Sequence, residues 1–189
     1  MIVKKFGCYY NVYMKNYEIV NYPTKNDLIQ LCKLDIEAYN EMDKGDLDKC
    51  LVWKKNCPEI YTALKFDGKF IGYINFVAIT EDCYKKFLMG RLKDYELKDD
   101  DIISFKKGEN YCLFMSIVID KMYRDTEAII RLSNAFIEKI NKMKQSGVIF
   151  GNVICDCVSQ DGEKFVKKVF NARFNCSSKN KTKIYKFKL

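Results

Sequence analysis

The sequence contains no histidine, and this absence removes whole classes of chemistry. Neither a Ser-His-Asp triad nor a Cys-His pair can be built from it. Any proton transfer must use a carboxylate, lysine, tyrosine, cysteine, a chain terminus or water. The lack of histidine also argues against a metal site, because zinc sites draw largely on histidine and cysteine. No apolar run approaches the length of a membrane span.

The cysteines lack the spacing of a metal or disulfide motif. The chain has nine of them, an odd number, and no CxxC pair. Cys155 and Cys157 flank Asp156, but a closed zinc site needs four ligands, usually at wider spacing. The chain start, from Met1 to Phe6, leads into polar, tyrosine-rich sequence and shows no signal segment. We therefore expect a cytoplasmic protein whose thiols are free and mostly buried.

What the chain does have is enough apolar material for a core and an excess of positive charge. Its 189 residues suit a single domain, and 48% of them are hydrophobic. Lys and Arg number 33 against 25 Asp and Glu, so the formal net charge is +8. This favours an anionic partner: nucleic acid, a phosphate-bearing cofactor or an acidic surface. We interpret the lysines near the end as the solvated face of a strand rather than a nucleic-acid site: Lys179, Lys181, Lys183, Lys186 and Lys188.

The most informative stretch covers residues 111–140. It begins YCLFMSIVID, a run rich in branched and aromatic residues that predicts a buried strand. A polar turn over 121–126 leads to apolar residues spaced by three and four, which predict an amphipathic helix: Ile129, Leu132, Phe136 and Ile140. Such a turn directs free backbone N–H groups and a positive dipole end at one spot, which suits a phosphate. A plain strand–helix packing stays open as the alternative, because no glycine marks the turn.

The rest of the chain also alternates between predicted strands and helices. We expect strands over 17–22, 60–66, 70–79, 148–157, 172–176 and 182–189, and helices over about 24–40 and 46–56. A further helix opens near Ser159 and stops at Asn171, a residue that tolerates left-handed geometry. Asp67-Gly68 signals a hairpin, and Gly72 marks a bulge or a close approach. The long insertion over 80–109 should pack against the sheet or a ligand.

This order of elements, over roughly residues 17–189, resembles the GNAT acetyltransferase family. YEIVNYPTKNDLIQLCKLDIEAYN has the usual strand, cap and helix of its opening, and IYTALKFDGKFIGYINFVAI looks like its middle strands. SIVIDKMYRDTEAIIRL looks like its fourth strand and phosphate-binding turn. The resemblance implies an α/β (α+β) fold with a mixed, mostly antiparallel central sheet of about seven strands flanked by helices. The chain would form one domain over 1–189, with an N-terminal extension over 1–16 and an insertion over 80–109 between the third and fourth strands.

The resemblance also implies a function and a site. It indicates an N-acetyltransferase that uses acetyl-CoA as co-substrate and acetylates a primary amine of a small molecule or peptide by direct attack. In the family the fourth and fifth strands splay, the pantetheine pairs with the fourth strand, here about residues 115–119, and a backbone N–H holds the oxyanion. The implied cofactor-binding residues are Ile117, Val118, Ile119, Arg124, Asp125, Thr126, Glu127, Ala128, Ile129 and Ser159. A carboxylate or a water chain usually takes the proton of the amine, and location makes Asp120 and Asp156 candidates.

The chain departs from the family pattern in two places. Ile119 and Arg124 match the family's valine and arginine, but bulkier residues replace a proline and two small residues: Lys121, Glu127 and Ile129. A carboxylate at Glu127 is unfavourable beside two phosphates if it points inward. No tyrosine lies around 165–167, where many members carry one thought to protonate the leaving thiolate. A GNAT-fold binding or regulatory protein without catalysis therefore stays open, as does, from charge alone, a nucleic-acid-binding domain.

The acceptor pocket in this family is built mainly from the first helices and the insertion, here residues 28–56 and 80–109. A cationic amine would be attracted by the acids of that insertion, although an exposed charge run explains them equally well. These acids are Asp94, Glu96, Asp99, Asp100 and Asp101.

Overall fold

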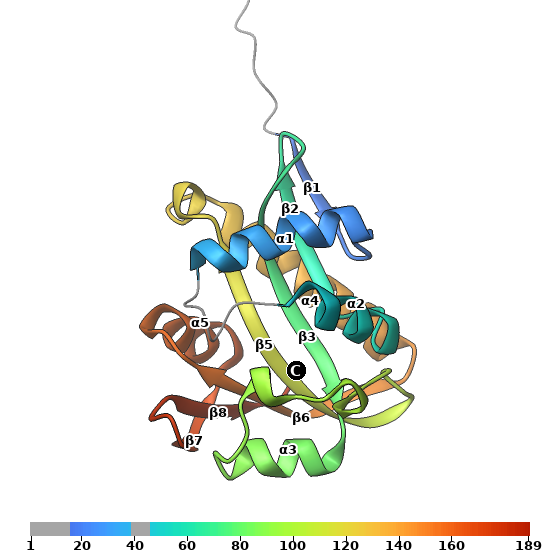
Figure 1. Ribbon diagram of the computed structural model, residues 1–189, viewed down its shortest axis with the longest axis vertical. Coiled ribbons are helices and arrows are strands. Elements are labelled where there is room, and N and C mark those ends of the chain that lie inside the picture. The colour runs from blue at the N-terminus through green and yellow to red at the C-terminus, as the bar shows by residue number, and fades with distance from the viewer. Residues whose placement is uncertain (1–15, 39–45) are drawn as a thin grey trace, which may run out of the picture.

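A computed structural model describes residues 16–38 and 46–189 of the chain. Its centre is one sheet with the strand order β1-β2-β3-β5-β6-β8-β7, and the short β4 pairs with β3 (Figure 1). The strands are β1 (Tyr17–Val20), β2 (Tyr61–Phe66), β3 (Lys69–Ile79), β4 (Ile102–Ile103), β5 (Gly108–Ile119), β6 (Val148–Cys157), β7 (Arg173–Ser177) and β8 (Lys183–Phe187). The predicted fold class is confirmed. Expectations for residues 1–15 and 39–45 lie outside the described residues.

Neighbouring strands are antiparallel except for one pair at the centre of the sheet. The β2–β3 hairpin turns through Asp67 and Gly68, which both have positive φ, 47° and 80°, as an Asp-Gly turn requires. β5 and β6 are parallel, and the chain passes between them through helix α4 (Ala128–Gln145). The predicted strand–turn–helix stretch is therefore the crossover that joins the two central strands.

Helices cover both faces of the sheet and divide the interior into two cores. α1 (Lys25–Ala38), α2 (Leu47–Asn56) and α3 (Glu81–Leu88) supply side chains to the first core, together with Tyr73 and Ile154 of the sheet. α4 and α5 (Gln160–Phe170) supply the second core on the other face. In Figure 1, α1 and α2 lie in front of the sheet and α4 lies behind it. The buried positions of α4 confirm the predicted stripe: Ala128, Leu132, Phe136 and Ile140, with Ile129 half-buried at its edge.

The insertion over 80–109 packs against the sheet, as predicted. Thr80 caps α3 by accepting the N–H of Cys83 at 3.3 Å, and Phe87 enters the first core with no exposed surface. Two short 3-10 helices follow, η1 (Asp94–Glu96) and η2 (Asp99–Asp101), and then β4. The insertion thereby brings Lys93 against Asp156 of β6, with which it forms an ion pair.

Two predicted backbone features are also present. Asn171 ends α5 in the left-handed region, at φ 50°, where its N–H donates to the carbonyl of Val166. Gly72 faces β5 so closely that a Cβ there would lie 2.6 Å from the carbonyl oxygen of Val118. The register of β2 and β3 shifts beside it, which marks a bulge.

In the described part of the chain, no helix combines the length and the apolar character that a membrane span needs.

Candidate functional site

The two central strands separate along part of their length. β5 pairs with β6 from Gly108↔Val148 as far as Leu113↔Ile154. Beyond that point β5 continues to Ile119 beside β3 alone, while β6 continues to Cys157 beside β8. The predicted splaying of these strands is confirmed, and it opens a gap in the middle of the sheet.

A bulge in β5 sits where the gap begins. Asn75 pairs with Ser116 and Phe76 with Phe114, so Met115 is an extra residue on the β5 side. Past the bulge, the N–H of Asp120 donates to the carbonyl of Ile71 on β3 at 2.8 Å. Successive residues of a strand direct their hydrogen-bonding groups to opposite edges. Ile117 and Ile119 therefore direct theirs toward the gap.

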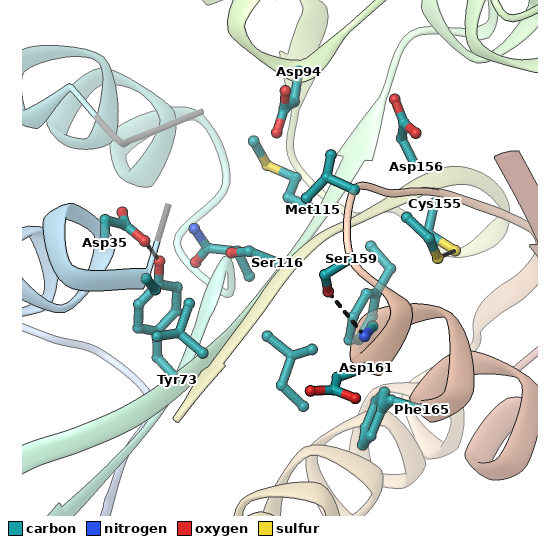
Figure 2. Close-up of a pocket in the computed structure, with 18 of the residues that line it drawn as sticks. Asp35, Tyr73, Asp94, Met115, Ser116, Cys155, Asp156, Ser159, Asp161 and Phe165 are labelled. Atoms are coloured by element: carbon teal, nitrogen blue, oxygen red, sulfur yellow. Dashed lines mark hydrogen bonds between the residues drawn. The ribbon is translucent and has the colours of Figure 1, made fainter. Parts of the chain in front are cut away.

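A cavity of about 950 Å³ occupies the gap and continues on both sides of it. It is lined by β5 from Leu113 to Ile119, by the end of β6 and by the start of α5, with α1, α2 and η1 on the opposite side. Figure 2 shows Ser159, Asp161 and Phe165 on one side of the β5 strand in this view and Asp35 and Tyr73 on the other. A volume of this size is typical of a small-molecule site.

The turn after β5 forms one corner of the cavity. Asp120 opens it by accepting the N–H of Met122 at 2.9 Å, and 3-10 helix η3 (Lys121–Tyr123) leads toward α4. Lys121, Arg124, Asp125 and Ile129 line the cavity here, and we call this set with the first turn of α4 the phosphate corner. Arg124 donates from Nε to the carbonyl of Ile119 at 3.2 Å, which holds its guanidinium beside the gap. Two cations and a helix N-terminus outweigh the one carboxylate, Asp125, at this corner, so the corner suits an anion.

Not all the residues predicted for cofactor binding line the cavity. Those that do are Ile117, Val118, Ile119, Arg124, Asp125, Ile129 and Ser159. Thr126, Glu127 and Ala128 do not belong to its lining. The N–H of Thr126 donates to the carbonyl of Tyr123, and the N–H of Ala128 donates to the hydroxyl of Thr126 at 3.2 Å. Two of the five backbone amides from Asp125 to Ile129 are therefore engaged within the turn.

Glu127 points away from the phosphate corner. Its carboxylate pairs with Arg131, one turn further along α4, with 3.1 Å between Oε2 and the Nη2 of the arginine. Both side chains are about half exposed, at 42% and 48%. The replacement of a motif glycine therefore does not bring a negative charge into the corner.

Ser159 is both a cap and a lining residue. Its hydroxyl accepts the N–H of Gly162 at 3.1 Å and so caps α5, and the same side chain borders the cavity. α5 contributes Phe165 and Val166 to the lining and no tyrosine. The tyrosines of the described cavity lining are Tyr73 and Tyr95, on β3 and η1.

The two candidate bases have different surroundings. Asp120 caps the turn and borders a small hollow beside α1 that adjoins the main cavity, but it does not line the main cavity itself. Asp156 lines the main cavity with its side chain 9% exposed. One of its oxygens accepts from Lys93, which also donates to the hydroxyl of Thr182 at 2.8 Å. The other oxygen, Oδ1, is buried without a hydrogen-bond partner among the described residues.

Several residues of the site carry no signal in the sequence. Lys93 lies 63 residues before its partner Asp156 in the sequence. Tyr73 lies 38 residues after Asp35, to whose carboxylate it donates a hydrogen bond. Tyr73 lies within an apolar strand, so the sequence pattern predicts only that it is a core residue. Of the five acids of the insertion, only Asp94 lines the cavity. Glu96 instead pairs with Lys179.

Two cysteines of β6 border the cavity on the face of the sheet that α4 and α5 cover. The sulfur atoms of Cys155 and Cys157 lie 4.0 Å apart on one face of the strand. The hydrogen bond with Cys157, followed by burial, raises the pKa of the Cys155 thiol, so this thiol stays protonated at neutral pH. Among the described residues, no group of three or more metal-ligating side chains comes together.

Comparison with known proteins identifies the fold. No protein-family model matches the sequence, and no curated protein matches it. Solved structures do match: the loading GNATL domain of CurA from Lyngbya majuscula has a TM-score of 0.61 at 11% identity over 92% of this chain and 98% of its own. Ard1 from Thermoplasma volcanium has a TM-score of 0.59 at 10% identity, with 92% and 96% covered. The PaiA N-acetyltransferase from Thermoplasma acidophilum, in complex with coenzyme A, has 0.57 at 14%, with 92% and 99% covered.

These structures share an architecture with the chain across nearly its whole length. The protein therefore has the GNAT fold. Identities of 10 to 14% establish the fold alone, so activity must be argued from the site.

Proposed function

We propose that the protein is an N-acetyltransferase that transfers an acetyl group from acetyl-CoA to a primary amine. The open edge of β5 beside the phosphate corner carries this proposal. It offers backbone donors and acceptors that have no neighbouring strand, two cationic side chains and a helix N-terminus along one continuous cavity. A coenzyme A complex of the same fold, the PaiA enzyme, supports a coenzyme A thioester as the ligand.

The residues fit each part of such a ligand. Arg124 and Lys121 hold the pyrophosphate at the start of α4, together with the amides of Asp125 and Ile129. Ile117 and Ile119 pair with the amides of the pantetheine arm through the backbone groups that face the gap. Ser159 borders the arm from the α5 side. The thioester end then points toward the bulge at Met115.

The reaction needs a neutral amine and a stabilised oxyanion. Acetyl-CoA supplies an activated carbonyl carbon. A backbone N–H on the gap side of β5 stabilises the oxyanion that forms when the amine nitrogen attacks. Asp156 accepts the proton of the ammonium on Oδ1, and Lys93 holds that carboxylate in place. The C–N bond forms and the C–S bond breaks. The nitrogen then gives up its second proton to the coenzyme A thiolate, and the proton held by Asp156 is released to water.

Calorimetric titration with acetyl-CoA, followed by thiol release with a panel of amines, tests the proposal. We expect binding together with amine-dependent release of coenzyme A. Absence of both heat and a thermal shift at millimolar acetyl-CoA would overturn the assignment.

A binding or regulatory role without catalysis is the second candidate. It is favoured by the composition of α5, which places Phe165 at the cavity and has no tyrosine of its own to protonate the thiolate. The same experiment separates the two, because this alternative gives coenzyme A binding without thiol release for any amine.

A further inference from the structure

Two thiols that the proposed transfer does not use lie together at the cavity. Cys155 and Cys157 are two residues apart on β6 and share one face of the strand, with 4.0 Å between their sulfur atoms. Both residues line the cavity. Cys155 is buried, with 2% of its surface exposed, while Cys157 is half-buried. Cys157 is therefore the thiol that a ligand reaches more easily.

The pair lies where the gap between the two central strands begins. Leu113↔Ile154 is the last pairing between β5 and β6, and Cys155 is the next residue of β6. From there to its end β6 is paired by β8, and its edge toward β5 has no neighbouring strand. The two cysteines therefore border the narrow end of the gap, on the face of the sheet that α4 and α5 cover.

The sulfur of a bound coenzyme A is carried toward the same place. In the proposed complex the pyrophosphate lies at the phosphate corner, and the pantetheine arm follows the open edge of β5 toward the bulge at Met115. The first turn of α4 and the start of α5 border the cavity on the face that the two cysteines share. The arm thus enters the gap from that face, and its sulfur end approaches Cys155 and Cys157.

The contact between the two thiols has a direction. The hydrogen bond with Cys157 raises the pKa of Cys155, and a hydrogen bond raises the pKa of a thiol when that thiol keeps its proton and donates it. Cys155 therefore donates its S–H to the sulfur of Cys157. A donor in this position stabilises negative charge on the acceptor sulfur, and the thiolate is the nucleophile in thiol–disulfide exchange. Cys157 is thus the reactive thiol of the pair.

We propose that Cys157 is a site of reversible thiolation by coenzyme A disulfide. The Cys157 thiolate attacks one sulfur of the ligand, the S–S bond of the ligand breaks, and a mixed disulfide between Cys157 and one coenzyme A forms. The other coenzyme A leaves as a thiolate and takes up a proton from water, which received the proton of Cys157. The sulfur of Cys157 is oxidised and the departing sulfur is reduced. This inference rests on the coenzyme A binding in the proposed function, not on the acetyl transfer.

The geometry of β6 favours a lasting mixed disulfide over a bond between the two cysteines. Cα atoms two residues apart on an extended strand are separated by about 6.6–6.8 Å, the outer limit for a disulfide. β8 pairs with both Cys155 and Cys157 and so holds this spacing. The attached coenzyme A then fills the cavity, so acetyl-CoA is excluded until a free thiol releases the adduct.

Intact-protein mass spectrometry after incubation with coenzyme A disulfide tests the inference. We expect a gain of one coenzyme A, mapped to Cys157 by peptide analysis and removed by dithiothreitol. Cys157→Ser should lose this adduct. Cys176→Ser is the matched control and should keep it, because Cys176 is also half-buried but does not line the cavity.

Peptide mapping of the wild-type adduct decides the site even if the serine variant fails to fold. Coenzyme A found only on other cysteines would overturn the proposal. A loss of two hydrogens without any adduct would also overturn it, because that result means that Cys155 and Cys157 bond to each other.

A second disulfide shows whether the cavity directs the reaction. Oxidised glutathione undergoes the same exchange but lacks a pyrophosphate. We expect coenzyme A disulfide to modify Cys157 about tenfold faster or more, and Arg124→Gln to remove most of this advantage without changing the rate with glutathione. Equal rates for the two disulfides in the wild type would mean that Cys157 is merely accessible, and would contradict the assignment.

The adduct is measured without any amine, so this inference and the transferase proposal can fail separately. If Cys157 gains coenzyme A but no amine is acetylated, thiolation stands and the transferase proposal fails. If amines are acetylated but Cys157 is not modified, the transferase proposal stands and thiolation fails. Calorimetry adds a further check: the thiolated protein should not bind acetyl-CoA, and dithiothreitol should restore binding. Unchanged binding after thiolation would contradict the placement of the adduct in the cavity.

Discussion

Arg124 and Glu127 are three residues apart, yet the fold gives them opposite surroundings. Arg124 borders the cavity and is tied to the carbonyl of Ile119, while Glu127 pairs with Arg131 on the outer side of α4. The substitution of a glycine by glutamate would matter most if the carboxylate faced a pyrophosphate. In this structure the charge is directed to an arginine one helical turn away, so the corner keeps a positive character.

Arg124 gives the first prediction for a single side chain. Arg124→Gln should weaken coenzyme A binding about tenfold, because a charge-assisted contact to phosphate contributes roughly 1.5–3 kcal/mol when desolvated and less at an exposed corner. Isothermal calorimetry measures this. Arg131→Gln is the matched control, since Arg131 of α4 carries the same charge nearby but does not line the cavity. Equal losses in the two variants would mean that only long-range charge acts.

Asp156 gives the second prediction. Asp120, the other candidate for the base, serves as the control. Asp156→Asn should lower kcat/KM for the amine about a hundredfold or more, the usual contribution of a positioned base, while coenzyme A binding stays unchanged. Asp120→Asn keeps an acceptor for the N–H of Met122 and should retain activity. The reverse result, with activity lost only in the Asp120 variant, would mean that Asp120, in the turn after β5, is the proton acceptor.

Among the elements, β5 matters most, because it belongs to the sheet at one end and to the cavity at the other. It pairs with β6 as far as Leu113 and with β3 from Tyr111 onward, so beyond Leu113 it is paired only by β3. The bulge at Met115 marks the change. A strand with one open edge can add a ligand as a further strand, which is the physical basis for the proposed pantetheine contact.

Gly72 on β3 supports this open half of β5 and gives the third prediction. Gly72→Ala places a Cβ 2.6 Å from the carbonyl oxygen of Val118, so the two strands must shift. We expect a loss of about 1–3 kcal/mol in the free energy of unfolding, measured with urea, and weaker coenzyme A binding. Gly151→Ala is the control, because its Cβ meets only the carboxylate end of Glu109, at 3.1 Å, and that side chain can move. Equal losses of stability in both variants would contradict the role given to Gly72.

In the molecule as a whole, the positive charge is distributed rather than concentrated. Lys179 pairs with Glu96 and Lys183 with Glu163, so two of the terminal lysines are engaged by acids elsewhere in the fold. The hydrogen bond from Lys183, together with those from Tyr185 and Lys167, lowers the pKa of Glu163 to about 2. This arrangement agrees with the interpretation of the last strand as a solvated, ion-paired surface.

Free buried thiols predict how the stability of the whole molecule depends on pH. Burial raises the pKa of Cys57 from its ordinary 9.0 to about 11. Between these values the unfolded chain loses the proton and the folded chain keeps it, so stability is present below pH 9 and is lost as the pH rises toward 11. For one fully buried thiol the loss is about 1.4 kcal/mol per pH unit.

Urea denaturation of the wild type and of Cys57→Ala from pH 7 to 10.5, with a reducing agent present, checks this effect. The variant should be less stable at neutral pH but should lose less stability above pH 9. The comparison is necessary because Lys139 acts in the opposite sense: burial lowers its pKa to about 8, so its contribution to stability rises between pH 8 and 10.5. Parallel curves for the two proteins would rule out the role of Cys57.

Local patterns were sufficient for most of the fold. Apolar spacing predicted α4 with its buried positions, Asp67-Gly68 predicted the hairpin, and Asn171 predicted the end of α5. Each of these depends on neighbours within a few residues, so the information lies in the local sequence. The minor strand β4 escaped prediction, because two residues carry no periodicity.

The site was predictable only where it lies on continuous chain. The strand–turn–helix stretch identified the edge of β5 and Arg124, but the direction of Glu127 required the position of Arg131 in space. The meeting of these carboxylates at one cavity was beyond reach, because Asp35, Asp94 and Asp156 are separated by about sixty residues each and come from a helix, an insertion and a strand.

The amino-acid order alone therefore established most of the element sequence and the absence of histidine chemistry, and it predicted the turn after β5 as a place that suits a phosphate. Tertiary folding decided where β5 leaves β6, which carboxylates share one cavity and which buried oxygens lack a partner. The reason is physical: secondary structure and turns follow from short-range sterics and apolar spacing, whereas electrostatic complementarity depends on distances between residues that only the folded chain brings together.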